Sequence, residues 1–247
     1  MLMNIRRLIL TALAMAALTL CISAEPAHDG NHAAITVSGE TGLVAATPGG
    51  PAKDASRIVI WLTPIDAVRP VSATTDRPRY RLVQHNKRFE PGLLVVPVGS
   101  VVDFPNLDPW FHNVFSLYRG KRFDLGLYQA GAQRSVRFDR IGPSYLFCNI
   151  HPEMTGVVLA IDSDLFSVSN KNGHYAISGV TPGRYVLHVW YENATPESLQ
   201  ALQRQVTIQN ENQIMPTILV KATRQIAPSH KNKYGQDYDP ETVKTDY

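Results

Sequence analysis

Seven consecutive residues, Cys148-Asn149-Ile150-His151-Pro152-Glu153-Met154, place a thiol, an imidazole and a thioether close together in the chain. Soft sulfur ligands combined with imidazole select copper, and two His, one Cys and a distant axial Met form a trigonal site suited to one-electron chemistry. The second imidazole can come from His112, 36 residues before Cys148. We therefore predict that His112, Cys148, His151 and Met154 bind one type 1 copper ion, with Cys148 as a thiolate.

Cysteine usage agrees with this prediction. The chain contains two cysteines, and Cys21 lies in an N-terminal segment that we expect to be removed, which leaves Cys148 as the one thiol. Unpaired thiols are a liability in an oxidising compartment. A buried inert cysteine, an intermolecular disulfide and a nucleophile are the alternatives. The nearby His151 and Met154 favour a metal ligand over all three.

The other histidines have no Cys or Met near them in the sequence that could complete such a site. We interpret His85, His174 and His188 as surface or interface residues, and we expect no metal role for His28 and His32. No Ser-His-Asp set and no pair of carboxylates indicates catalysis, so we predict that the protein is not an enzyme.

The neighbours of the ligands have expected roles too. Asn113 is placed to hydrogen-bond across to the ligand loop, and three apolar residues are expected to keep water from the metal: Phe111, Phe147 and Pro152. A short loop after a strand that ends at the thiol limits how far the ligands can move. This arrangement suits electron transfer, which requires little reorganisation of the site.

The N-terminus has the features of an export signal. Arg6 and Arg7 precede an apolar run, Leu8–Leu20, that is too short for a comfortable membrane span, and cleavage after Ala24 is expected. Leu18-Thr19-Leu20-Cys21 is similar to a lipidation motif, but Leu20 stands where a small residue is wanted, so we do not expect lipidation. We predict a periplasmic protein with no integral membrane segment after removal of the signal.

The exported chain has little net charge. Removing residues 1–24 leaves 223 residues and, because the two arginines go with them, lowers the formal charge from +3 to +1. Such a balance gives no electrostatic basis for binding nucleic acid. The expected partners are periplasmic redox proteins that bind transiently.

The rest of the sequence predicts an all-β fold of short strands separated by turns. One short helix is expected over 196–203, loops over 39–54 and 66–79, and a hairpin turn at Asn170-Lys171-Asn172-Gly173. Residues 222–247 are polar and lack a hydrophobic period, which predicts a disordered tail. The expected strands are 33–38, 57–63, 80–84, 92–97, 100–104, 112–116, 135–138, 144–148, 154–161, 166–169, 174–178, 185–190, 206–208 and 217–221.

Residues 80–162 resemble the cupredoxin family, particularly its plastocyanin and amicyanin branch. The resemblance rests on Val102-Asp103-Phe104-Pro105-Asn106-Leu107-Asp108, on His112-Asn113-Val114 and on the Cys-x₂-His-x₂-Met loop. It implies a Greek-key β-sandwich and the same four copper ligands. Phe111, where such sequences usually have Pro, and the long connection 117–134 depart from the family pattern.

A second resemblance is to the carboxypeptidase regulatory-like, or transthyretin-like, β-sandwich. It rests on Asn172-Gly173-His174-Tyr175-Ala176-Ile177 and on Val180-Thr181-Pro182-Gly183-Arg184-Tyr185. The expected domains are a signal peptide (1–24), N-terminal strands and loops (25–79), the copper domain (80–162), this second sandwich (163–221) and the tail (222–247). Residues 33–65 match the opening of the second sandwich, so we hypothesise that the copper domain is inserted in it and that strand 57–63 pairs with the 174–190 hairpin.

A chain with both features resembles exported proteins labelled methylamine-utilisation proteins. That label does not establish a substrate. The leading hypothesis is a periplasmic copper protein that carries single electrons between redox partners. Two alternatives stay open: a copper-binding or sensing protein whose metal does not cycle, and an envelope- or carbohydrate-binding module. The last of these would keep its activity without Cys148.

Overall fold

The computed structural model describes residues 35–45, 54–66, 79–117, 120–223 and 231–238. The predicted signal peptide, the lipidation question at Cys21, and His28 and His32 all lie outside these residues. The elements are β1 (Ile35–Ala45), β2 (Val59–Pro64), β3 (Tyr80–Arg81), β4 (Val83–His85), β5 (Arg88–Glu90), β6 (Leu93–Pro97), β7 (Ser100–Pro105), β8 (His112–Ser116), β9 (Phe123–Tyr128), β10 (Gln133–Phe138), β11 (Gly142–Phe147), β12 (Thr155–Ile161), β13 (Phe166–Val168), β14 (His174–Val180), β15 (Gly183–Trp190), α1 (Pro196–Gln200), β16 (Arg204–Ile208), β17 (Gln213–Ile214) and β18 (Ile218–Ala222).

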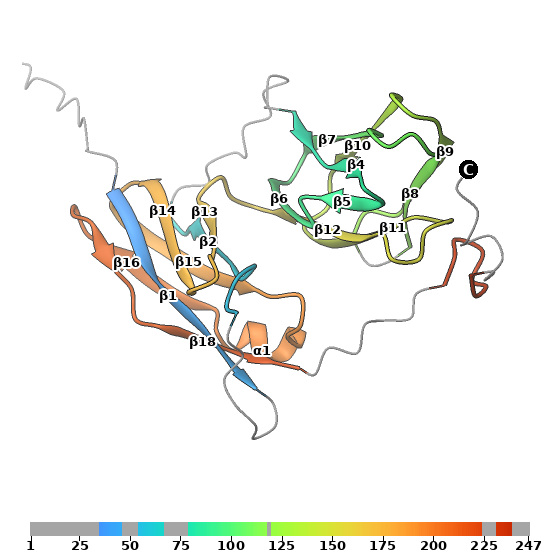
Figure 1. Cartoon of the computed structure of the whole chain (residues 1–247). Coiled ribbons are helices and arrows are strands. Elements are labelled where there is room, and N and C mark those ends of the chain that lie inside the picture. Colours follow the sequence, from blue (N-terminus) through green and yellow to red (C-terminus); the bar gives the residue numbers. More distant parts are fainter. Residues whose placement is uncertain (1–34, 46–53, 67–78, 118–119, 224–230, 239–247) are drawn as a thin grey trace, which may run out of the picture. The chain divides into compact units, whose positions relative to one another are not determined.

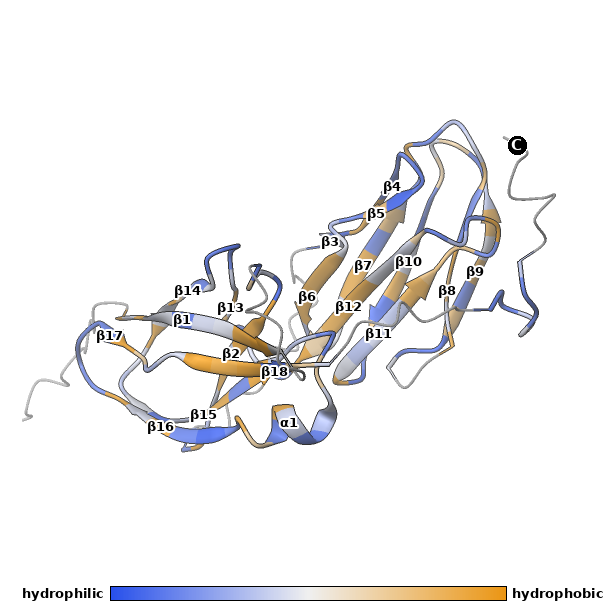
Figure 2. Ribbon diagram, turned by 60° about the horizontal axis from the view of Figure 1, so that its bottom comes forward, coloured by the Kyte–Doolittle hydropathy of each residue, from blue (hydrophilic) through white to orange (hydrophobic). Residues whose placement is uncertain are grey.

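The predicted all-β class is confirmed. The one helix of the described residues, α1, is five residues long; Thr195 caps it by accepting a hydrogen bond from the N–H of Ser198, and Pro196 occupies its first turn. No helix in the described part of the chain is long and apolar enough to cross a membrane. Figure 2 shows hydrophobic residues concentrated in β2, β6 and β12. Strands with such apolar runs contribute their side chains to the cores.

The strands between residues 80 and 161 form one sandwich (Figure 1). One sheet has the order β10-β7-β3, and the other has the order β6-β12-β11-β8-β9. Side chains from both sheets share a core that includes Phe104 and Phe138 from the smaller sheet and Val114, Leu146 and Val158 from the larger one. Sheets whose inner faces share a core in this way make a β-sandwich.

The remaining strands form two further sheets. In one, β1 pairs antiparallel with β14 and parallel with β17 and β18; the other has the order β13-β2-β15-β16. Ile60 and Leu62 of β2, Val37 of β1, and Ile177 and Leu187 are buried in a common core. These two sheets therefore form a second sandwich.

The expected pairing of strand 57–63 with the 174–190 hairpin is present only in part: β15 shares a sheet with β2, whereas β14 belongs to the other sheet, so 174–190 is not a hairpin. β2 and β15 run antiparallel with Leu62 opposite Leu187, and β1 faces β14 with Val37 opposite Ile177. Strands that precede residue 79 in the chain therefore share sheets with strands that follow residue 162. The residues of the first sandwich lie between these two sets in sequence.

Two expectations about loops differ from the structure. Residues 39–45 belong to β1 rather than to a loop, because Gly39 and Glu40 pair with β14 while Thr41–Ala45 pair with β18. The connection 117–134 contains a strand, β9, which pairs antiparallel with β8. In the first place pairing with strands distant in sequence outweighs the local turn composition, and in the second place pairing with the preceding strand does so.

The turn at Asn170–Gly173 is present, but it joins different sheets. Asn170 accepts hydrogen bonds through its side chain from the N–H groups of Asn172 and His174, and Gly173 has φ +83°. β13 before the turn pairs with β2, whereas β14 after it pairs with β1. The turn is therefore a corner between two sheets and not the end of a two-stranded hairpin.

Substitution of Gly173 tests the packing of this corner against β1. A Cβ at Gly173 would lie 2.0 Å from the carbonyl oxygen of Thr41, whereas a Cβ at Gly179, also at positive φ, would meet nothing within 4 Å. We expect Gly179→Ala to cost about 1 kcal/mol through backbone strain alone. Gly173→Ala should cost at least roughly 3 kcal/mol, because the corner must also move away from β1. Urea unfolding measures both, and equal costs would contradict the described contact.

Candidate metal centre

His112 begins β8, a strand in which every residue is buried. β8 lies inside the larger sheet between β11 and β9, where Phe115 faces Phe147 and His112 faces Tyr128. The imidazole of His112 has no exposed surface. Since the strand is paired on both edges, the position of this side chain is fixed by the sheet.

The other candidate ligands lie in the connection between β11 and β12. These strands pair antiparallel up to Phe147 and Thr155, so the ligand loop, residues 148–154, closes a hairpin. The N–H of Cys148 donates to the carbonyl of Met154 (3.3 Å), and the N–H of Met154 donates to the carbonyl of His151 (3.1 Å). The two hydrogen bonds make the loop compact and bring its first and last residues together.

Three donor atoms converge inside the protein. The Nδ1 atoms of His112 and His151 lie 3.0 Å apart, and the Sγ atom of Cys148 lies 4.0 Å from the first and 3.7 Å from the second. A metal held by nitrogens at about 2.0–2.1 Å and a sulfur at about 2.3 Å needs donors that are roughly 3.3–3.8 Å apart. The distance from Sγ to Nδ1 of His151 falls in this range and the other two lie within about 0.3 Å of it, so the triangle is close to the size that a single metal ion requires.

The four predicted ligands occupy one region. His112, Cys148 and His151 form the one cluster of three or more potential metal-ligating His, Cys, Asp or Glu side chains within the described residues. Met154 stands at the end of the ligand loop and is fully buried in the same core as Cys148. His151 is 6% exposed, and the other three have no exposed surface.

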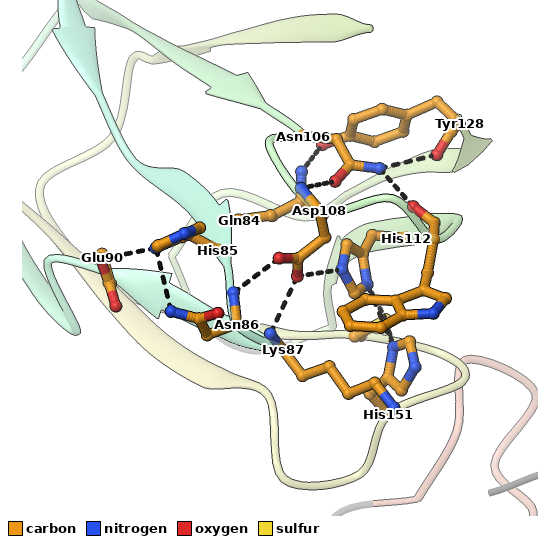
Figure 3. A network of polar contacts seen from close by, with 12 residues as sticks. Gln84, His85, Asn86, Lys87, Glu90, Asn106, Asp108, His112, Tyr128 and His151 are labelled. Carbon is orange, nitrogen blue, oxygen red and sulfur yellow. Dashed lines mark hydrogen bonds and ion pairs between the residues drawn. The ribbon is translucent and has the colours of Figure 1, made fainter. Parts of the chain in front are cut away.

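Asp108 orients His112 (Figure 3). Its Oδ2 lies 2.8 Å from Nε2 of the imidazole, and only 3% of its side chain is exposed. A carboxylate in this position holds the ring proton on Nε2 and leaves the lone pair of Nδ1 directed at the thiol and the second imidazole. This is the arrangement that carboxylate–histidine–metal sites use to fix a ligand.

The two-residue turn between β4 and β5 fixes the orientation of Asp108. Asn86 and Lys87 occupy this two-residue turn with φ of +52° and +54°, the positive values that a type I′ turn requires. Their backbone N–H groups donate to the two carboxylate oxygens of Asp108 at 2.6 and 2.8 Å. Asn tolerates positive φ but Lys rarely adopts it, so the carboxylate stabilises a conformation that is unfavourable at Lys87.

Asn106 shapes the chain that leads to His112. Its side-chain oxygen accepts from the N–H of Asp108 (3.0 Å), while its amide donates to the carbonyls of Trp110 (2.7 Å) and Tyr128 (3.3 Å). Asn106 has no exposed surface. A buried amide with these partners fixes the path of residues 106–112 between two strands.

The hydroxyl of Tyr128 lies in the same polar network. It donates to the carbonyl of Phe104 (3.0 Å) and accepts from the side-chain amide of Gln84. Burial raises the pKa of Tyr128 above its ordinary value. This tyrosine therefore stays a neutral donor and connects β9 to the smaller sheet.

Burial keeps both imidazoles neutral. It lowers the pKa of His112, against the opposing effect of Asp108, and it lowers the pKa of His151 to about 4, with the neighbouring His112 adding to the shift. Burial raises the pKa of the Cys148 thiol, although the backbone N–H groups of Asn113, Ile150 and His151 act in the opposite direction. Neutral imidazoles and a thiol that three N–H groups can stabilise as a thiolate are suited to a bound cation.

Two expected neighbours behave differently. The side-chain amide of Asn113 donates to Asp124 on β9 (2.7 Å) and does not cross to the ligand loop; its backbone N–H is the group that faces Cys148. Phe111 is 47% exposed, more than expected for a residue that keeps water from the metal. Phe147 is buried, and Pro152 is half-buried.

Sequence reasoning missed Asp108 as a partner of His112. The one available signal was that Asp108, the last residue of the Asn-Leu-Asp stretch, precedes His112 by four positions. It also missed the turn at Asn86 and Lys87, which comes from a separate part of the chain. No local pattern connects that turn to the ligands.

Several solved copper proteins are similar in structure to part of this chain. They include a purple cupredoxin from Nitrosopumilus maritimus (23% identity, 33% of this chain and 99% of that chain, TM-score 0.31) and a mutant of amicyanin in its Cu(I) form (21%, 34% and 82%, 0.32). The copper-containing nitrite reductase NirK from Thermus scotoductus SA-01 is a third (19%, 49% and 28%, 0.34). At these values the likeness by itself carries no argument about function. No protein-family model and no curated protein matches the sequence.

The first site prediction concerns Asp108. Asp108→Ala should lower the free energy of unfolding of the metal-free protein by roughly 3 kcal/mol, because two backbone N–H groups and the Nε2–H of His112 lose a buried charged acceptor. Asp139→Ala is the control, since Asp139 pairs with Lys121 at the surface and is half exposed, and it should change stability little. Urea unfolding followed by tryptophan fluorescence makes the comparison. Equal effects of the two substitutions would rule out the orienting role.

Proposed function

We propose that this protein binds one copper ion through His112, Cys148, His151 and Met154 and carries single electrons between redox partners. The observation that carries the proposal is the convergence of one thiol and two Nδ1 atoms within 3.0–4.0 Å of one another in a buried site. When the Nδ1 atoms of two neutral imidazoles lie 3.0 Å apart, either one ring donates an N–H to the other or a cation lies between them. A cation also satisfies the thiol.

The donor set favours copper over zinc. Zinc accepts thiolate and imidazole ligands, but a thioether that completes such a set is a soft ligand typical of copper. Met154 is buried at the end of the ligand loop, in the same core as Cys148. Copper in such a set supplies reversible one-electron chemistry.

The surrounding chain suits a site that changes little between oxidation states. His112 is fixed by a strand paired on both edges and by Asp108. Cys148 and Met154 are tied to each other through the loop backbone. Four ligands from the protein leave no evident position for a substrate, which supports a carrier and not an enzyme.

The compartment and the second sandwich complete the proposal. We infer export to the periplasm from the N-terminal sequence, Arg6-Arg7 followed by Leu8–Leu20, and an oxidising compartment is compatible with a thiol that is held as a metal ligand. The sandwich built on β1, β2 and β13–β18 supports a transthyretin-like companion module, since its strand pairing follows the pattern that the sequence resemblance implies. We assign this module a structural or recognition role.

The metal prediction is tested by colour. Addition of one equivalent of Cu(II) to the metal-free protein should produce an intense visible band from thiolate-to-copper charge transfer, and Cys148→Ser should abolish it. Reversible voltammetry of the wild type separates a carrier from a copper protein whose metal does not cycle. A colourless wild type under oxidising conditions would refute the copper assignment, and a coloured but electrochemically irreversible one would refute the carrier.

We propose that redox partners dock beside His112. Leu107, which precedes Asp108, and Phe111, which precedes His112, are 58% and 47% exposed, and Leu127, next to Tyr128 on β9, is 56% exposed. Exposed apolar side chains next to a redox centre suit weak, transient contacts of small area. The same surface would serve electron self-exchange between two copies.

Docking is tested with matched charge substitutions. Phe111→Glu should slow electron self-exchange at least about ten-fold through repulsion between like charges and loss of apolar contact, without changing the visible spectrum. Ile141→Glu is the control: Ile141 is 59% exposed, but it precedes β11, roughly 20 Å along the strand from Cys148. NMR line broadening in mixtures of oxidised and reduced protein gives the rates. Equal rates for the two variants would mean that electrons leave by another face.

A further inference from the structure

Residues 231–238, here called the C-terminal strap, contact the ligand loop. The sequence predicted a disordered tail over 222–247; Ala222 instead ends strand β18 and the strap is ordered by its own hydrogen bonds, while residues 224–230 and 239–247 lie outside the described residues. The side chain of Asn232 accepts from the N–H groups of Tyr234 and Gln236, and Gly235 turns the chain at φ +78°. Figure 1 draws the strap in red.

Two contacts of the strap reach the ligand loop itself. The hydroxyl of Tyr238 donates to the carbonyl oxygen of Cys148 (2.8 Å), and the N–H of Lys233 donates to the side-chain oxygen of Asn149 (3.0 Å). Cys148 is a predicted ligand, and Asn149 lies between it and His151. These hydrogen bonds span 90 and 84 residues of sequence.

A third contact leads to the strand that bears His112. The ammonium group of Lys233 pairs with Asp124 on β9 at 2.8 Å, and Asp124 also accepts from the side chain of Asn113, the residue after His112. The Lys233 side chain is only 21% exposed. Because the pair is partly shielded from water, it is stronger than an ordinary surface pair.

We propose that Tyr238 and Lys233 are positioning residues for the metal centre: the strap holds the ligand loop against β8 and β9 and so slows opening of the loop. The proposal rests on the proposed function for its effect on copper, but the contacts exist in the protein without metal. A strap that bonds the backbone of the thiol ligand and the strand of the first imidazole resists separation of the two. Opening of the loop, which metal entry and release require, must break these contacts.

The effect on bound copper has a defined direction. An O–H group that donates to the backbone carbonyl of Cys148 places positive partial charge on the residue that would supply the thiolate, which disfavours the more highly charged Cu(II) state relative to Cu(I). Removing the donor should therefore lower the reduction potential. Groups around metal ligands tune a site in this manner without touching the metal.

The test uses two tyrosines of the strap. Tyr238→Phe keeps the ring and removes the donor to Cys148, whereas Tyr234→Phe removes a hydroxyl from a residue that is 70% exposed. In the metal-free protein, Tyr238→Phe should accelerate hydrogen exchange of the Cys148 and Met154 amides about five-fold, as expected for the loss of one hydrogen bond. Tyr234→Phe should leave these amides unchanged.

Two further measurements complete the experiment. Lys233→Met, which removes the charge but keeps the side chain long, should accelerate the same amides without changing those of β15 in the other sandwich. With Cu(II) bound, Tyr238→Phe should lower the reduction potential and speed copper release to a chelator, again about five-fold. Equal exchange in all variants and the wild type would overturn the proposal. A wild type that binds no copper would refute the proposed function, while the exchange of the metal-free protein would still decide the role of the strap.

Discussion

The contacts of the Asp108 carboxylate are the interactions on which the candidate metal centre depends. The carboxylate is almost fully buried and accepts the N–H groups of Asn86 and Lys87 together with Nε2 of His112. Burial acts to raise its pKa, but these donors together lower it, so the group stays ionised. One buried charge thus stabilises the turn at Asn86 and Lys87 and selects the tautomer of His112. Removing it would leave three donors without an acceptor, which costs far more than any of these hydrogen bonds contributes alone.

The ligand loop is constrained in a different way, by closure. β11 and β12 are paired up to the residues on each side of the loop, and the Cys148–Met154 backbone hydrogen bond continues that pairing by one step. The thiol and the thioether are therefore placed by sheet geometry before any metal is bound. His151 is the exception, since it lies inside the loop and is the most exposed of the four. Its position depends on the loop backbone and, through Asn149, on the strap.

The sequence predicted those parts of the site that are local. The Cys-x₂-His-x₂-Met spacing, the strand that ends at Cys148 and the strand that begins at His112 all depend on neighbouring residues, and β11, β12 and β8 have nearly the expected bounds. The contacts of Asp108 with Asn86, and of Tyr238 with Cys148, join residues 22 and 90 positions apart. Neither end of such a contact carries a pattern of its own. β1 was predicted too short for the same reason: the pairing of Gly39–Ala45 with two distant strands overrides its Gly- and Ala-rich composition.

The position of the first sandwich, residues 80–161, in the chain has a physical explanation in the strands that flank it. β2 and β13 are antiparallel neighbours with Trp61 opposite Phe166, so the chain leaves β2 and returns to β13 at the same end of the pair. Ser163 donates to the carbonyl of Leu62 (2.6 Å), and Asp162 accepts from the indole of Trp61 (2.9 Å), which ties the point of return to the point of departure. The entropic cost of closing a loop grows only with the logarithm of its length. A segment that folds on its own core and has its ends close together therefore adds little cost to the hairpin that contains it. On this basis the sandwich of β1, β2 and β13–β18 can form whether the connection between β2 and β13 is long or short. The positions of the candidate ligands are therefore determined within the first sandwich, by its strands and by the strap that contacts them.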